Sequence, residues 1–383
     1  MKKRIFVWFV TVCLLAMDGS PLLAADSIKL GFHAPLTGFA ASDGKSALEG
    51  AKLAVAQINA AGGVLGKSLE LVVYDDEAKP AQAIPIANKL IGQDHVVVGI
   101  SGSYSGATRS AAGIFQEAKI PYISAYGIHP DITRAGEYVF RTSFLGHVQG
   151  KAGAKLIGDM MGKKRVVMIT LQNDFGQSLA AGFKDMAPTY GIQIVGSYQY
   201  SMKDRQFGAI VAKVKADNPD AIYASGYYFT AGPLVSQLRA AGVSCPVIGQ
   251  EGYDSQKFIE IAGPAAEGVI ITTSLDRDST VPETADFITA FEKAAGFKVD
   301  MVAASGHTAV KVAADAIQRA GSTDPGKILA ALKTTNLAVS TGTIRFNALG
   351  EVMKAVQVQV VKDGNWHHYA VIDDPKLLAP PDK

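Results

Sequence analysis

Short apolar runs alternate with longer stretches of helical apolar spacing along most of this 383-residue chain. The period-two run at 28–32 predicts a first strand, and Leu48 and Ala51 begin the apolar face of a first helix. Ser46 and Glu49 have the spacing of a capping box, which predicts that this helix starts at Ser46. Strand and helix in alternation predict parallel sheets that helices cover on both faces.

The same alternation continues through the middle of the chain. Further strands are predicted at 69–74, 96–99, 121–124, 138–141, 166–170, 192–198, 221–225, 247–250 and 269–273. Helices between them are predicted at 80–91, 150–161, 177–190, 207–216, 231–241 and 254–262. In parallel sheets of this kind, ligands bind beyond the carboxyl ends of the strands.

The end of the chain breaks this rhythm. Three helices are predicted in succession, at 283–295, 303–320 and 325–332. Three strands follow them, at 343–346, 355–361 and 366–372. Gln357 and Gln359 among alternating valines favour an antiparallel edge with one wet face. We expect the late helices to return to the first sheet and the last strands to the second, so that the chain crosses between two lobes more than once.

The most informative loop follows the apolar run at 96–99. It consists of small hydroxyl residues and glycines, and a helix with Ala111 and Phe115 on its apolar stripe begins after it. The first N–H groups of a helix lack intrahelical partners and lie at the positive end of its dipole. This arrangement predicts a cradle for a small anion, although a flexible turn has the same composition.

Residues 1–25 have the pattern of a secretory signal peptide. Basic residues 2–4 precede an apolar stretch at 5–17, and small residues at 22–25 form the cleavage region; an uncleaved anchor is the alternative. The signal holds three of the 37 basic residues and one of the 35 acidic ones, so the remaining chain is balanced at 34 of each. This balance gives no indication of nucleic acid or an anionic membrane surface as a partner.

The order and spacing of several short strings identify a family. They include Ile58–Gly63, Tyr74–Asp76, Pro130–Thr133, Phe140–Thr142, Asp174–Gly176 and Glu251–Gly252. Together they resemble the type I periplasmic binding proteins for leucine, isoleucine and valine, which are the solute receptors of ABC importers. The resemblance implies an α/β fold of two doubly wound parallel-sheet lobes with a three-segment hinge. It assigns 27–143 and 275–344 to lobe 1, and 144–274 and 345–375 to lobe 2.

The resemblance also implies which residues meet the ligand. Ser105, at the helix start after the hydroxyl loop, matches the residue that holds an amino-acid carboxylate. The backbone of Gly127 and Ile128 would serve the ammonium and the carboxylate respectively, and Glu251 in the second lobe would pair with the ammonium. Because acceptor and donors lie on different lobes, closure would depend on the ligand.

The side-chain pocket departs from the family pattern. Aromatics that cover the ligand match Phe175 and Tyr227, but Asp43 stands where the family often has an aromatic residue. Asp43 is either a solvated turn residue or a partner for a polar or cationic side chain. Tyr104 and Tyr126 would narrow the pocket. These departures concern which amino acid binds and leave the amino-acid prediction unchanged.

No motif of an enzyme, metal site or cofactor site is found in the sequence, so none of the three is predicted. The hypothesis is an exported periplasmic receptor that captures a branched-chain or related amino acid and delivers it to an ABC permease in the cytoplasmic membrane. An aromatic acid, an amide or a polar or cationic amino acid is the alternative ligand. A sensory module on the same fold is the alternative role.

Overall fold

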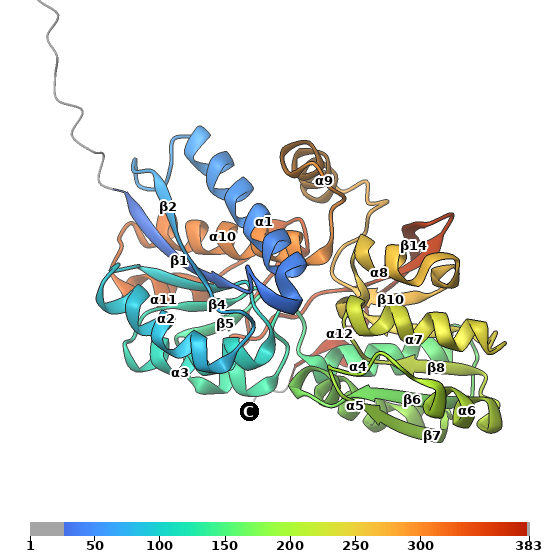
Figure 1. The fold of residues 1–383 in the computed structure, drawn as a ribbon. Helices are drawn as coiled ribbons and strands as arrows, with labels where there is room; N and C mark the ends of the chain where they lie inside the picture. The colour runs from blue at the N-terminus through green and yellow to red at the C-terminus, as the bar shows by residue number, and fades with distance from the viewer. Residues whose placement is uncertain (1–26, 381–383) are drawn as a thin grey trace, which may run out of the picture.

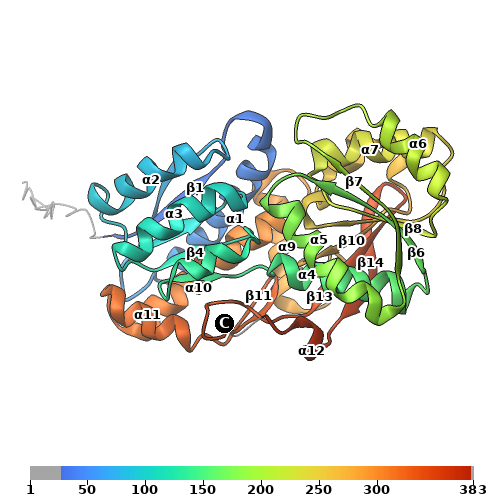
Figure 2. The ribbon, with the colours of Figure 1, turned by 90° about the horizontal axis from the view of Figure 1, so that it is seen from below.

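The computed structural model describes residues 27–380, so the predicted signal peptide lies outside the described residues. Two lobes lie side by side, and each contains one large sheet (Figure 1). Seen from below, helices flank the strands of both lobes (Figure 2). The expected α/β fold with two mainly parallel sheets is confirmed.

The sheet of the first lobe is parallel throughout, in the order β2-β1-β3-β4-β5. Its strands are β1 (Ile28–Ala34), β2 (Leu69–Asp75), β3 (Val98–Ser101), β4 (Tyr122–Ser124) and β5 (Val139–Arg141). The three central strands are almost entirely buried, because helices cover both faces of the sheet.

Two helix layers enclose this sheet. The helices are α1 (Ala41–Ala60), α2 (Pro80–Gly92), α3 (Ser105–Glu117), α10 (Met301–Ala320) and α11 (Pro325–Lys333). α2 and α3 pack on one face around Phe115, while α1 and α10 pack against each other and contribute to the core of the other face. α9 (Pro282–Ala295) lies beside α1, and a hairpin of β11 (Leu337–Val339) and β12 (Gly342–Ile344) lies beside α10. The late helices therefore return to the first sheet, as expected.

The second sheet has the order β14-β13-β10-β9-β8-β6-β7. Its parallel strands are β6 (Arg165–Leu171), β7 (Gln193–Tyr200), β8 (Ala221–Ala224), β9 (Val247–Gln250) and β10 (Ile270–Thr273). β13 (Val356–Lys362) joins β10 in antiparallel register, and β14 (Asn365–Ile372) forms the edge. The last strands thus complete the second sheet.

Helices also cover both faces of the second sheet. α4 (Gly146–Lys155), α5 (Asp174–Met186) and α12 (Pro375–Leu378) lie on one side of it. α6 (Gly208–Asp217), α7 (Tyr228–Ala240) and α8 (Gln256–Ala262) lie on the other. Three segments connect the lobes: residues 142–145 after β5, 274–281 after β10, and 345–355 after β12.

The start of α1 corrects one prediction. α1 begins at Ala41, directly after a 3-10 turn at Gly38–Ala40, so Ser46 lies inside the helix rather than at its cap. The Ser46 hydroxyl donates instead to Oδ1 of Asp300 at 2.6 Å. Asp300 is the N-cap residue of α10. This contact joins residues 254 positions apart, which a local capping pattern cannot show.

Two smaller differences also follow from tertiary contacts. α4 begins at Gly146, four residues before the predicted start, because the first crossing segment leads straight into it. The short strand β11 was not predicted, and it forms by pairing with β12. Apart from the short helix α12, for which the sequence predicts no element, the other strands and helices lie within a few residues of their predicted ranges.

Candidate ligand-binding site

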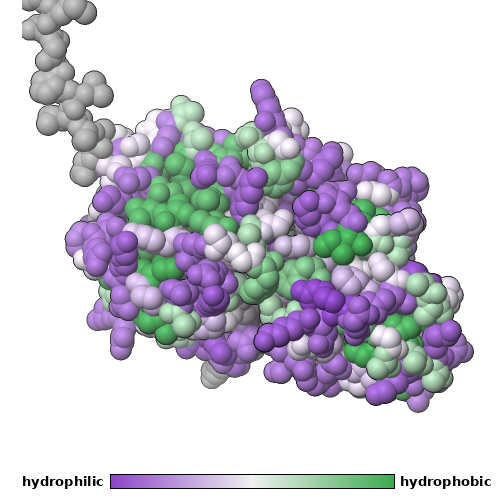
Figure 3. Space-filling view, in the orientation of Figure 1, coloured by the Kyte–Doolittle hydropathy of each residue, from purple (hydrophilic) through white to green (hydrophobic). Residues whose placement is uncertain are grey.

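A cavity lies between the two lobes and contains about 310 Å³ of space not filled by protein atoms. Its walls are Asp43, Tyr104, Ser105, Tyr126, Phe175, Tyr227, Glu251, Gly252, Met301 and Val302. Hydrophilic residues line the rim of both lobes, a broad hydrophobic area lies on the visible face of the first lobe, and paler residues gather where the lobes meet (Figure 3). This figure includes space that is open to solvent, so the enclosed part of the cavity is smaller. The cavity therefore suits a small ligand.

On the first-lobe side, α3 directs its N-terminus at this cavity. Tyr104 is the N-cap in an extended conformation, and its side chain does not cap the helix. Ser105 is the first helical residue and is buried, and its Oγ accepts the N–H of Ile128 at 3.1 Å. This bond does not use the hydroxyl proton of Ser105, which can be donated to a ligand in the cavity. This end of the cavity can hold a carboxylate.

Buried hydrogen bonds hold the loop before Ser105 in place. The Ser103 hydroxyl donates to Asp76 Oδ1 at 2.9 Å, and Asp76 Oδ2 lies 2.6 Å from His33 Nδ1. Tyr126 Oη donates to the carbonyl of Gly102 at 2.6 Å. The loop is thus a rigid part of the wall rather than a flexible turn.

On the second-lobe side, Glu251 follows β9 in a 3-10 turn at Glu251–Tyr253. It is buried, and neither carboxylate oxygen has a hydrogen-bond partner among the described residues. Burial raises the pKa of Glu251 from 4.5 to about 8, and the nearby charge of Lys354 partly opposes this shift. A buried carboxyl without a partner at a cavity wall is an acceptor available to a cationic group.

Lys354 lies on the third crossing segment and was not singled out from the sequence. Its Nζ is buried without a hydrogen-bond partner among residues 27–380 and sits 5.1 Å from the centre of the Phe144 ring. Burial lowers the pKa of Lys354 from 10.5 to about 7, against the influence of Glu251. A buried amine on the third crossing segment therefore interacts electrostatically with the Glu251 carboxyl.

Asp43 is also in the wall, in the first turn of α1. Tyr104 Oη donates to Asp43 Oδ2 at 2.7 Å. Burial raises the pKa of Asp43 to about 7, and Asp300 and Asp254 raise it further, while the bond from Tyr104 acts in the opposite direction. The interpretation of Asp43 as a solvated turn residue is wrong, because only 5% of its surface is exposed.

Aromatic rings from both lobes stack across the cavity. The ring of Tyr104 lies parallel to that of Tyr227 with their centres 4.2 Å apart, and Phe175 stacks against Tyr227 at 4.8 Å. Outside the cavity, Phe39 meets Phe229 edge to face at 5.5 Å. The lobes are in direct contact around the site, as a closed clamp would be.

Gly127 and Ile128 do not line the cavity. The carbonyl of Gly127, expected to accept from an ammonium, accepts instead from Arg141 Nη1 at 2.6 Å and from the Ser124 hydroxyl at 3.2 Å. The N–H of Ile128, expected to serve the carboxylate, donates to Ser105. Their backbone therefore positions other groups, and the neighbouring Tyr126 takes the place in the wall.

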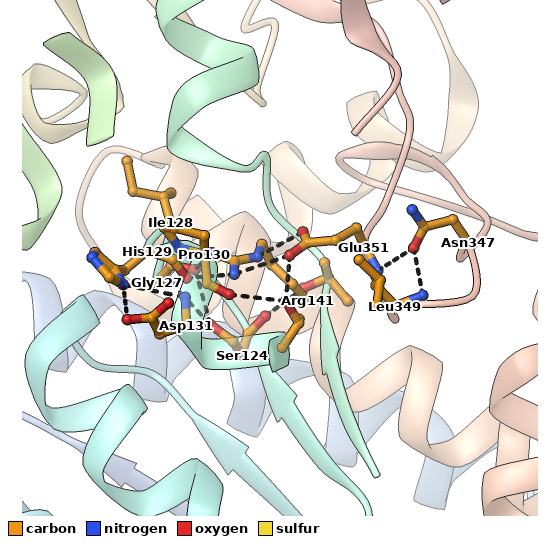
Figure 4. A network of polar contacts seen from close by, with 12 residues as sticks. Ser124, Gly127, Ile128, His129, Pro130, Asp131, Arg141, Asn347, Leu349 and Glu351 are labelled. Atoms are coloured by element: carbon orange, nitrogen blue, oxygen red, sulfur yellow. Dashed lines mark hydrogen bonds and ion pairs between the residues drawn. The ribbon is translucent and has the colours of Figure 1, made fainter. Parts of the chain in front are cut away.

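Arg141 ties this loop to the hinge, as the close-up of the network shows (Figure 4). Its guanidinium forms a bidentate pair with Glu351 of the third crossing segment, at 2.9 and 3.2 Å, and also donates to the carbonyl of His129. Thr133 donates to the same carboxylate. The Arg141 side chain is fully buried, and these partners stabilise its charge in place of water.

Six of the eight predicted site residues line the cavity: Asp43, Tyr104, Ser105, Phe175, Tyr227 and Glu251. Tyr126, expected to narrow the pocket, lines it as well. Gly252, Met301 and Val302 complete the wall, although the sequence did not assign them to the site. The sequence did offer one signal for Met301 and Val302: Asp300 is a typical N-cap residue and marks the start of α10. The first residues of a helix lie at one end of a lobe, where a ligand can reach them.

Within residues 27–380, His, Cys, Asp and Glu side chains form no group that could hold a metal ion. No helix in the same range is long and apolar enough to cross a membrane. The walls combine an anion-binding helix start, an unpaired carboxyl and stacked aromatic rings. A cavity of this kind between two α/β lobes defines a solute-binding protein.

The comparison with protein families agrees. A family model described as periplasmic binding protein matches residues 27–365, and the chain belongs to this family. Its relatives are substrate-binding proteins of ABC transporters rather than enzymes. The predicted family and the prediction that the chain is not an enzyme are confirmed.

Individual relatives cover nearly the whole chain. A leucine-, isoleucine-, valine-, threonine- and alanine-binding protein of Pseudomonas aeruginosa is 31% identical over 333 residues, which are 86% of this chain and 88% of the relative. A branched-chain amino acid transporter substrate binding protein of Streptococcus pneumoniae, solved with isoleucine, has a TM-score of 0.85 and 28% identity, over 90% of this chain and 99% of its own. A solute binding protein of an ABC transporter from R. palustris, solved with benzoate, has a TM-score of 0.82 and 25% identity, over 90% and 96% of the two chains.

Proposed function

We propose that this substrate-binding protein captures an α-amino acid between its lobes and delivers it to an ABC permease in the cytoplasmic membrane. Residues 1–25 would export it to the periplasm. The two lobes, 27–143 with 275–344 and 144–274 with 345–375, would move against each other about the three crossing segments. In this proposal the walls of the cavity are the binding site.

The observation that carries this proposal is the pair of opposite ends in one cavity. The α3 N-terminus and the Ser105 hydroxyl offer donors to a carboxylate, and Glu251 offers two unpaired oxygens to an ammonium. A zwitterion satisfies both ends with charge-assisted hydrogen bonds. Burial favours the neutral form of Glu251 in the ligand-free protein, and the ammonium of a bound ligand would favour the ionised form, so that ligand binding and protonation of Glu251 are coupled.

Titration calorimetry against the twenty common amino acids tests this function. We expect one or a few of them to bind, and Glu251→Gln to weaken that binding about 30-fold or more, because the ammonium loses a buried charged partner. Glu260→Gln is the matched control on the same lobe, since the Glu260 side chain is half exposed and pairs only with Lys257 on its own helix, α8. Undiminished affinity in Glu251→Gln would contradict the role of Glu251.

An aromatic acid is the second candidate. The stacked rings of Tyr104, Tyr227 and Phe175 favour it, and so does the benzoate complex of the R. palustris protein. Glu251 argues against it, because a benzoate ion offers this carboxylate no donor. Benzoate therefore belongs in the same titration series, and its binding in the absence of any amino-acid binding would replace the first proposal.

A further inference from the structure

The cavity contains one more acceptor than an ordinary zwitterion can satisfy. Two carboxyl groups line it, Glu251 from the second lobe and Asp43 from the first, and no lysine, arginine or histidine is among its lining residues. One α-ammonium can pair with Glu251. A second group of the ligand has to account for Asp43.

Asp43 is bound on one side only. The structure gives its carboxyl a single hydrogen bond within residues 27–380, from Tyr104 Oη to Oδ2, whereas a carboxylate accepts at about four positions. The same tyrosine stacks on Tyr227, so it fixes the carboxyl at the edge of the aromatic wall. The remaining acceptor positions are therefore left for a group inside the cavity.

The other acids near Asp43 already have partners of their own. Asp300 accepts from Ser46 and from the N–H of Ala303. Asp254 pairs with Arg277 and accepts from Thr273 at 2.5 Å and from the N–H of Met301 at 3.2 Å. Neither of them lines the cavity, but both carboxyls act on Asp43 electrostatically and make a positive group there more favourable.

We propose that Asp43 and Tyr104 form a second subsite, which binds an ammonium on the ligand's side chain, so that the ligand is a short diamino acid. This proposal rests on the proposed function, because the α-amino and α-carboxyl groups occupy Glu251 and Ser105. The stacked rings of Tyr104 and Tyr227, with centres 4.2 Å apart, leave little space beside Asp43 and restrict the side chain to a few atoms. Burial disfavours the ionised form of Asp43, and a neighbouring ammonium would offset that cost.

A matched pair of probes tests the subsite. L-2,4-diaminobutyrate and L-norvaline have the same chain length and differ at the terminal position, which is an ammonium in one and a methyl group in the other. We expect wild-type protein to bind diaminobutyrate at least about tenfold more tightly than norvaline in titration calorimetry, because a buried acceptor is left unpaired by the methyl group.

Asp43→Asn should reduce this preference to about threefold or less, since the amide is neutral and nearly isosteric. Asp286→Asn, at an exposed position of α9, is the control and should keep the wild-type preference. A thermal unfolding scan of each variant shows that it is folded. Should Asp43→Asn not fold, the wild-type preference alone still decides the proposal.

The outcomes separate the two proposals. Norvaline binding as tightly as diaminobutyrate to the wild-type protein would overturn the second subsite and leave the amino-acid function intact. An unchanged preference in folded Asp43→Asn would equally overturn the role of Asp43. If neither these two probes nor any of the twenty amino acids binds, the proposed function itself fails, and the subsite fails with it.

Discussion

At the scale of single residues, the site is built on charges that the fold has removed from water. Glu251 and Lys354 have opposite pKa shifts for the same reason, since burial disfavours the charged form of each. Each partly offsets the shift of the other by its charge. A protein that kept these groups only for stability would do better with apolar residues, so their presence points to binding.

The Glu251 carboxyl leads to a prediction about pH. Its pKa rises from 4.5 to about 8 on folding, so between these values the folded chain holds a proton that the unfolded chain has released. Stability from this group is therefore lost as the pH rises through that window. We expect the unfolding free energy of Glu251→Gln, relative to the wild type, to increase by about 1–3 kcal/mol from pH 5 to pH 8.

Urea unfolding of the ligand-free proteins at several pH values measures this difference. Glu260→Gln is again the control, and its stability relative to the wild type should stay constant because Glu260 is exposed. Parallel pH profiles of Glu251→Gln and the wild type would show that the Glu251 carboxyl keeps its ordinary pKa.

At the scale of elements, the contact of α1 with α10 shapes the first-lobe wall. α1 carries Asp43, and the first residues of α10 are Met301 and Val302 of the cavity. Two glycines allow the helices to touch: a Cβ on Gly50 would lie 2.0 Å from the carbonyl oxygen of Ala303, and one on Gly306 would lie 2.3 Å from that of Ala47. Backbone atoms cannot move aside as a flexible side chain can.

Gly50→Ala should therefore force α1 away from α10. We expect a loss of about 1–3 kcal/mol in unfolding free energy from overpacking, together with weaker ligand binding, because Asp43 moves relative to Met301. Gly113→Ala on α3 is the matched control: a Cβ there meets no atom within 4 Å, and we expect it to stabilise the protein by about 0.4–1 kcal/mol. Equal effects of the two substitutions in urea unfolding would contradict the close approach.

At the scale of the whole molecule, contacts between the lobes accompany the closed cavity. Arg109 of α3 lies 3.2 Å from Asp174 at the start of α5, so this ion pair bridges the two lobes. If the lobes open to admit a ligand, the pair breaks, and its energy then contributes to ligand affinity. Both side chains are partly exposed, so the contribution is small.

A double-mutant cycle with Arg109→Ala and Asp174→Ala measures this contribution in calorimetry with the amino acid that binds best. We expect a coupling of about 0.2–1 kcal/mol in binding free energy at low salt, which screening removes near 1 M salt. The pair of Arg319 and Asp315 within α10 is the control and should show no coupling in affinity. If Arg109 and Asp174 show no coupling in binding free energy, their ion pair does not break when the ligand leaves.

The sequence by itself determined the order and type of nearly all elements and the two-lobed α/β fold. Through the resemblance to a known family it also pointed to Ser105 at the start of a helix and to Glu251 after a strand. Local periodicity, loop composition and the spacing of family motifs indicate these features, and each of these signals spans a few residues of chain.

Only the tertiary structure decided how those residues are charged, paired and enclosed. The bond from Tyr104 to Asp43 joins positions 61 apart, and the pair of Arg141 with Glu351 joins positions 210 apart. Burial, desolvation and close helix contact depend on what the folded chain places around a group, which no local pattern contains. For that reason the sequence could name Asp43 but not show that it is buried, and it assigned Gly127 and Ile128 to the site together with Tyr126, whereas of these three only Tyr126 lines the cavity.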